Sequence, residues 1–189
     1  MISKGEKTKK FIIDRSIKLF SEKGYTSVTM KDVCEKCEMS RGGVYRYFSS
    51  TKEIFIEMLN LDIEVNRKIV EESIKKGISA EKILDGYFNQ EMNSIFNENN
   101  GLYFAIHEFA FQEEDQKENL NKRLRDSIEI IGEILSYGQK NKEFKPFDTE
   151  VVATHLIYFM DSLKTSSSIF KLSKDMIIKQ INLLKEIVI

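Results

Sequence analysis

The chain of 189 residues contains one proline, nine glycines, two cysteines and no tryptophan. Few turn-forming residues are available for a multi-stranded sheet, and the abundance of Lys, Glu, Ile and Leu predicts an all-helical protein. No apolar run approaches the roughly 20 residues that a membrane span requires. The N-terminal stretch carries charges through its apolar part, unlike a signal peptide. We therefore expect a cytoplasmic protein that does not enter a membrane.

Positive charge is concentrated at the N-terminus. Residues 1–52 contain 12 basic and 6 acidic side chains, a net charge of +6, whereas the other 137 residues contain 17 basic and 24 acidic ones, a net charge of −7. A basic segment of this kind indicates a module that binds a polyanion. The acidic remainder predicts a second module with a different task.

Apolar periodicity, capping residues and glycines predict about nine helices. Gly24 and Gly77 are expected to end the first and fourth helices, and Thr29 and Ser40 to cap the second and third. The fourth helix crosses from the basic segment into the acidic remainder without a linker. The predicted ranges are 7–23, 30–37, 41–48, 52–76, 80–97, 102–114, 117–139, 148–168 and 173–188.

The two short helices at 30–37 and 41–48, joined by three residues, form a helix-turn-helix. Arg41 lies at the start of the second of them, where it can hydrogen-bond a guanine edge or a phosphate. The neighbouring glycines remove side-chain bulk, and Lys52 at the start of the next helix can hold a phosphate. The predicted DNA-contacting residues are Thr29, Ser40, Arg41, Gly42, Gly43, Tyr45, Arg46, Tyr47 and Lys52.

These residues resemble the TetR family of bacterial transcriptional regulators. The matching elements span about 45 residues: Phe20, Lys23-Gly24-Tyr25, Thr29, the run from Ser40 to Phe48, and Lys52-Glu53. A weaker match covers Asp148, Ala153 and Asp161-Ser162-Leu163. The resemblance implies a homodimer that binds a palindromic operator, with recognition helices about 34–36 Å apart, and that is released by a small ligand.

Positions 37 and 38 depart from that family, which usually has alanine and then glycine there. Cys37 is small and apolar enough to substitute. Glu38 is a bulky residue where a left-handed conformation is expected. Cys34 and Cys37 are predicted to pack in the core rather than to sense redox state or bind metal, because His107 and His155 lie far away in the sequence. No metal or cofactor is predicted.

An aromatic and methionine-rich band in the acidic remainder has two interpretations, an ordinary helical core or an effector pocket. A neutral hydrophobic effector is favoured over a lipophilic cation. His107 and Glu108 invite a catalytic interpretation, but a buried, hydrogen-bonded histidine is preferred, and we expect no enzyme. The predicted pocket residues are Phe88, Met92, Phe96, Tyr103, Phe104, His107, Phe111, Tyr137 and Phe159.

The last two predicted helices carry more apolar surface than one chain can cover, which favours a four-helix interface with a second copy. The predicted interface residues are Val152, Leu156, Phe159, Leu163, Ile177, Ile181 and Leu184.

The resulting hypothesis is a dimeric repressor with a DNA-binding domain at 1–52 and a ligand-binding and dimerisation domain at 53–189. The alternative is a helical small-molecule-binding protein whose basic head binds another polyanion, such as RNA or a membrane surface. The helix-turn-helix discriminates between them, because the alternative gives no reason for Gly42-Gly43 beside Tyr45 and Lys52.

Overall fold

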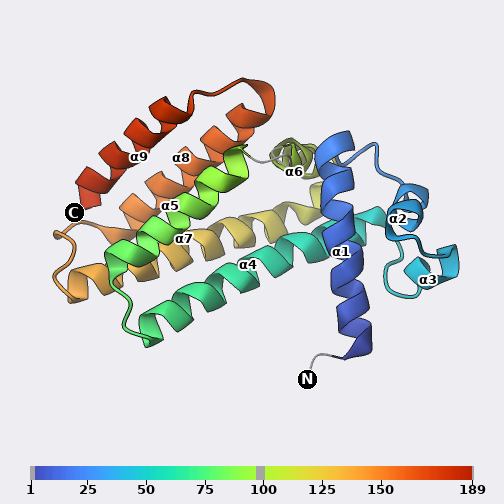
Figure 1. The fold of residues 1–189 in the computed structure, drawn as a ribbon, viewed down its shortest axis with the longest axis horizontal. Coiled ribbons are helices and arrows are strands. Elements are labelled where there is room, and N and C mark those ends of the chain that lie inside the picture. Colours follow the sequence, from blue (N-terminus) through green and yellow to red (C-terminus); the bar gives the residue numbers. More distant parts are fainter. Residues whose placement is uncertain (1–2, 97–100, 189) are drawn as a thin grey trace. The chain divides into compact units, whose positions relative to one another are not determined.

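The computed structural model describes residues 3–96 and 101–188, and this part of the chain is helical without strands. The predicted all-helical fold is confirmed, and each predicted helix is present. The elements, labelled in Figure 1, are α1 (Lys4–Lys23), α2 (Met30–Cys37), α3 (Arg41–Tyr45), α4 (Thr51–Lys75), α5 (Ala80–Phe96), α6 (Leu102–Gln112), the 3₁₀ turn η1 (Glu114–Gln116), α7 (Lys117–Lys140), α8 (Thr149–Ile169) and α9 (Lys174–Val188).

The chain folds into two compact units. The first contains the described residues of 1–62 and 98–117, and the second those of 63–97 and 118–189. The continuous helix α4 passes from the first unit into the second. Helix α6 belongs to the first unit, so it packs with the N-terminal helices although it comes later in the chain. The boundary predicted after residue 52 concerns function and stays a prediction.

Local hydrogen bonds explain where the helices of the first unit begin and end. The Thr29 hydroxyl accepts from the Asp32 N–H, the Asp32 carboxylate accepts from the Thr29 N–H, and Ser40 Oγ accepts from the Gly43 N–H at 3.2 Å. These bonds confirm the two predicted caps. Helix α1 begins three residues earlier than predicted, because Ser3 forms another capping box there. Helix α3 ends at Tyr45 rather than Phe48, since the chain tightens into a turn.

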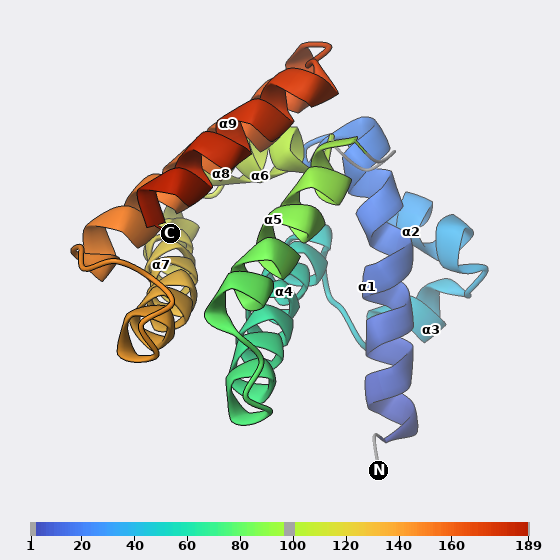
Figure 2. The same cartoon turned by 60° about the vertical axis from the view of Figure 1, so that its left-hand side comes forward.

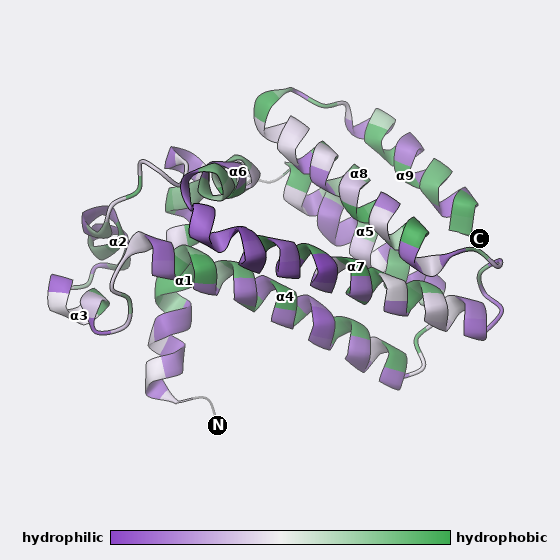
Figure 3. Cartoon of the chain, turned by 180° about the vertical axis from the view of Figure 1, so that it is seen from behind, coloured by the Kyte–Doolittle hydropathy of each residue, from purple (hydrophilic) through white to green (hydrophobic). Residues whose placement is uncertain are grey.

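The second unit packs α5, α7, α8 and α9 around one apolar core. Helix α7 buries one stripe, which includes Ile130, Ile134 and Leu135, and its opposite side is hydrophilic, as Figure 3 shows. Helix α5 contacts α8, and α8 and α9 lie side by side in both Figure 1 and Figure 2. The core of this unit is thus built from helices that are far apart in the sequence.

The turn between α2 and α3 forms despite Glu38. This residue adopts a left-handed conformation with φ 53° and ψ 37°, and its N–H donates to the carbonyl of Glu35. The N–H of Met39 donates to the carbonyl of Cys34 at 3.0 Å. A side chain in this region costs roughly 1–2 kcal/mol relative to right-handed backbone. The helix-turn-helix therefore keeps its turn at the expense of local strain.

Replacing Glu38 with glycine should relieve this strain. We expect Glu38→Gly to raise the free energy of unfolding by about 0.5–1 kcal/mol, because glycine adopts positive φ freely but loses more backbone entropy on folding. Urea denaturation measures the change. The control Glu35→Gly, in the right-handed interior of α2, should lower the same free energy by about 1 kcal/mol. A Glu38→Gly protein no more stable than the parent would show that the turn is unstrained.

Candidate nucleic-acid interface

Helix α3 presents polar side chains on its outer surface and is anchored by its inner one. Val44 is buried, as are Val33 and Phe48, which join the short helices into one unit. Arg41 and Arg46 are exposed, and Tyr45 keeps 44% of its surface exposed. Because Arg41 and Tyr45 are four residues apart in a helix, they lie on the same face. This surface offers guanidinium and hydroxyl donors to an acidic partner.

Several of the predicted contact residues also take part in the fold, including Ser40, which caps α3. Thr29 caps α2 and also hydrogen-bonds the Asp32 carboxylate through its hydroxyl. Tyr47 is half-buried rather than exposed. In contrast, a Cβ atom placed on Gly42 would meet no atom within 4 Å outside its immediate chain neighbours and its own helix backbone. The packing of the fold therefore does not require glycine at position 42.

Lys52 lies at the start of α4, but two acidic side chains hold it. Its Nζ atom is 2.8 Å from Glu113 Oε2 and 2.8 Å from each carboxylate oxygen of Asp115. Hydrogen bonds to Asp115 and Glu113 raise the pKa of the Lys52 ammonium, and the same bonds lower the pKa of both carboxyls. Sequence reasoning missed this cluster, because more than 60 residues separate Lys52 from the two acids.

The segment after α1 is tied to α6 by Glu108. The Tyr25 N–H donates to Glu108 Oε2 at 2.7 Å, and the Thr26 hydroxyl donates to Glu108 Oε1 at 3.1 Å. Gly24 has φ +77°, and a Cβ atom there would lie only 2.3 Å from Glu108 Oε2. Glu108 therefore holds the turn that follows α1.

Aromatic rings complete the attachment of α6. Phe55 and Phe109 have ring centroids 4.8 Å apart, and the ring of Tyr25 lies 5.0 Å from the first and 4.9 Å from the second. The Tyr25 hydroxyl donates to Glu113 Oε1 at 2.6 Å. Burial, together with the hydrogen bond to Glu113, raises the pKa of Tyr25. Tyr25 is thus both a core ring and a polar link to the segment that holds Lys52.

The predicted pocket residues are divided between the two units. Phe88 is buried in the core of the second unit, and Met92, Tyr137 and Phe159 pack against that core. Four others lie on α6 in the first unit: Tyr103, Phe104, His107 and Phe111. Of these, Phe104 is 48% and Phe111 85% exposed, and Phe96 on α5 is 42% exposed. Phe109 of α6 is only 1% exposed, so burial differs widely among the three phenylalanines of this helix.

The second unit contains a shielded ion pair that sequence reasoning missed. Lys164 Nζ on α8 lies 2.5 Å from Glu91 Oε2 on α5, and these side chains are only 18% and 11% exposed. Glu91 follows Leu84 and Phe88 and precedes Ile95 on the buried stripe of α5. An acidic residue in phase with an apolar stripe is the signal that could have predicted a buried partner.

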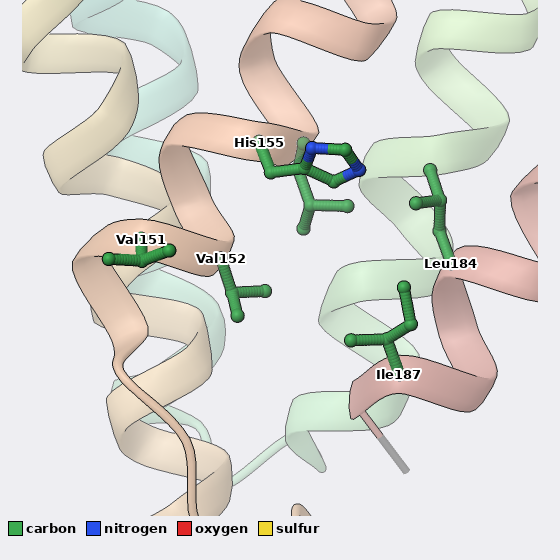
Figure 4. Close-up of a pocket in the computed structure, with 6 residues that line it drawn as sticks. Val151, Val152, His155, Leu184 and Ile187 are labelled. Atoms are coloured by element: carbon green, nitrogen blue, oxygen red, sulfur yellow. The ribbon is translucent and has the colours of Figure 1, made fainter.

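Helices α8 and α9 enclose an apolar groove of about 210 Å³. Figure 4 shows Val151, Val152 and His155 of α8 on one side and Leu184 and Ile187 of α9 on the other. Val151 and Ile187 are 63% and 46% exposed, so the rim of the groove is apolar and open.

The residues predicted for a dimer interface pack largely within their own unit, and the interface itself stays a prediction. Leu156, Ile177, Ile181 and Leu184 are at most 5% exposed, inside the core of their own unit. Val152, Phe159 and Leu163 are partly buried against the same core. The large apolar residues that these helices leave exposed are Val151, Tyr158, Ile169, Met176, Ile178, Leu183 and Ile187.

Cys34 and Cys37 are buried in the first unit, and burial raises the pKa of the Cys37 thiol. This placement agrees with core packing, since a raised pKa lowers thiol reactivity. Among the described residues, no group of three or more His, Cys, Asp or Glu side chains is arranged to hold a metal ion. The described helices include none with the length and apolar character needed to cross a membrane.

Two family models match the chain. The model "Bacterial regulatory proteins, tetR family" matches residues 12–58, and "Tetracyclin repressor-like, C-terminal domain" matches residues 83–178. The first match covers the helix-turn-helix and the start of α4, and the second covers half of the chain.

Individual proteins are similar over most of the chain. The HTH-type transcriptional regulator YfiR of Bacillus subtilis is 28% identical over 79% of this chain and 73% of its own length. IcaR of Staphylococcus aureus, a negative transcriptional regulator of the icaADBC biofilm operon, is 27% identical over 74% of this chain and 68% of its own length. The structure of E. coli NemR in its reduced form shares the fold, with a TM-score of 0.79, 17% identity and coverage of 97% and 98% of the two chains.

Removing Lys164 should destabilise the second unit, because Glu91 would stay buried without its counter-charge. We expect Lys164→Met to lower the free energy of unfolding by about 3 kcal/mol, and the double variant Glu91→Leu, Lys164→Met to recover much of that loss. Chemical denaturation of both variants measures the difference. A single variant as stable as the parent would mean that water, not Lys164, compensates the Glu91 charge.

Proposed function

We propose that this chain, which belongs to the TetR family of bacterial transcriptional regulators, represses transcription as a homodimer bound to a palindromic operator. A small hydrophobic effector releases it from the DNA. The observation that carries the proposal is the outer surface of α3, where Arg41, Tyr45 and Arg46 are exposed while Val44 is buried beneath them. A helix of this size fits the major groove.

Different residues of this surface suit different parts of the duplex, the base edges and the phosphates. The guanidinium groups of Arg41 and Arg46 can donate two hydrogen bonds to a guanine edge, which discriminates between bases. Ser40, at the N-terminus of α3, and Lys52, at the start of α4, are placed to meet phosphates. Gly42, where the fold leaves room for a side chain, keeps the helix surface low so that the backbone can approach the bases. Such a protein acts in the cytoplasm, where the bacterial chromosome lies.

A second copy would cover the exposed apolar face of α8 and α9. Val151, His155 and Tyr158 recur at spacings of four and three residues on α8, and Met176, Leu183 and Ile187 at spacings of seven and four on α9. These spacings put each set on one helix face. Two such helix pairs form a four-helix interface that is self-complementary about a twofold axis. The dimer sets two α3 helices about one duplex turn, roughly 34–36 Å, apart.

Several features support an effector site in the second unit. The family model for tetracycline-repressor-like C-terminal domains covers most of its helices. Phe88, Met92 and Phe159 supply apolar contacts, and the Glu91–Lys164 pair is a polar group that a ligand could meet. Helix α4 runs unbroken from Lys52 into this unit. If the protein has two conformations that differ in the position of α4, an effector that binds one of them more tightly would shift the DNA-binding equilibrium. We assign no catalytic reaction to the protein.

Selection of bound duplexes from a random-sequence library tests the proposed function. We expect an enriched site with twofold symmetry and half-sites about one helical turn apart. On that site, Arg41→Ala and Arg46→Ala should each cost about 1–3 kcal/mol of binding free energy, and less on random DNA. Fluorescence anisotropy at fixed salt measures both affinities.

The same experiment can overturn the proposal. If the library yields no enriched sequence while RNA or anionic vesicles bind tightly, the basic head serves another polyanion. Equal losses on both duplexes would restrict the arginines to phosphate contacts.

A charge on the exposed face of α9 should separate the dimer. We expect Leu183→Glu to give a monomer that binds the selected site at least tenfold more weakly, because a single half-site loses the avidity of two. Leu183 is 60% exposed, so the fold should survive. Light scattering and circular dichroism measure assembly and folding. The control Ile69→Glu, at a residue of α4 that is 51% exposed, should stay dimeric. A dimeric Leu183→Glu protein would place the interface elsewhere.

A further inference from the structure

The ammonium group of Lys52 is fully engaged within the first unit. A lysine ammonium has three N–H donors, and Lys52 Nζ has three oxygens at 2.8 Å: Glu113 Oε2, Asp115 Oδ1 and Asp115 Oδ2. A DNA phosphate that approaches Lys52 therefore meets a cation whose donors already face carboxylates. Contact with the duplex requires one of these carboxylates to leave.

The two carboxylates are held differently. Glu113 has a side chain 20% exposed and also accepts the Tyr25 hydroxyl at 2.6 Å, so it is fixed from two sides. Asp115 lies in the 3₁₀ turn η1, and its side chain is 62% exposed. It also accepts a hydrogen bond from the Gln116 side-chain amide at 2.9 Å, but this bond is exposed. The Asp115 carboxylate can therefore turn into water without breaking a buried contact. Asp115 is therefore the group that exchanges with an incoming anion.

We propose that Asp115 is a positioning residue that competes with operator phosphate for Lys52. This inference rests on the proposed DNA contact of Lys52. In the free protein Asp115 holds the ammonium at the start of α4; on DNA a phosphate oxygen replaces the aspartate, and the carboxylate is left beside a polyanion. The competition lowers the affinity for every duplex alike, since phosphates carry no sequence information.

The chain offers a matched control one residue away. Glu114 is also acidic and even more exposed, at 83%, but it pairs with Lys117 at 3.5 Å rather than with Lys52. Neutralising Glu114 removes the same charge from the same turn and reports the general effect of less repulsion from DNA. Any additional effect at Asp115 then belongs to its contact with Lys52.

The experiment compares Asp115→Asn with Glu114→Gln, each in the parent and in a Lys52→Met background, by anisotropy on the selected duplex and on random DNA. In the parent, Asp115→Asn should tighten binding to both duplexes by about threefold to fivefold more than Glu114→Gln does. In the Lys52→Met background the two variants should be equal. Lys52→Met alone should weaken binding to both duplexes and lower the salt slope by about one.

The outcomes separate the inference from the function on which it rests. If Lys52→Met leaves affinity and salt slope unchanged, the proposed DNA contact of Lys52 is wrong. If Lys52→Met weakens binding but Asp115→Asn matches Glu114→Gln in both backgrounds, the contact stands and the competition is overturned. Weaker binding by Asp115→Asn would also overturn it, because the aspartate would then hold Lys52 in place for DNA.

Discussion

The contacts of Tyr25 hold the first unit together. This residue follows the glycine that ends α1. Its backbone N–H and its ring tie it to α6, and its hydroxyl ties it to Glu113, just after α6. Its ring is buried edge-on against both Phe55 and Phe109, which adds aromatic contacts, and its polar contacts fix the direction of approach. This attachment also places η1 next to the start of α4, because Glu113 and Asp115, which hold Lys52, come directly after α6 in the chain.

Helix ends were predictable from sequence because their causes are local. Thr29 with Asp32 and Ser40 with the Gly43 N–H act over three residues, and the glycine after α1 has the positive φ that its position requires. The cluster around Lys52 was not predictable, since no pattern in the sequence connects it to residues in the turn after α6. The Glu91–Lys164 pair lies between these cases: periodicity shows that Glu91 is in a buried stripe, but not which cation meets it.

Apolar periodicity could not separate the core side of α9 from its exposed side, and the reason is physical. In α9 the apolar residues Met176, Ile177, Ile178, Ile181 and Ile187 extend over more than half of the helix circumference. Periodicity then identifies a helix but does not show which side faces the core. In the folded chain, Ile177 and Ile181 are buried in the core, whereas Met176 and Ile187 stay exposed. The surface available to a second copy is therefore the side that the core does not use.

The distribution of charge in the first unit matters more for DNA binding than its sum. Residues 1–52 have a net charge of +6, but the residues at 53–62 and 101–117 that fold with them contribute seven acidic and one basic side chain, which cancels that excess. Attraction to a polyanion then depends on the local field at α3. Lys23 and Lys52 are both paired with acids inside the unit, whereas Arg41 and Arg46 are exposed on its surface. In the function we propose, recognition therefore depends on a few exposed arginines, and the carboxylates around Lys52 lower the affinity for every duplex.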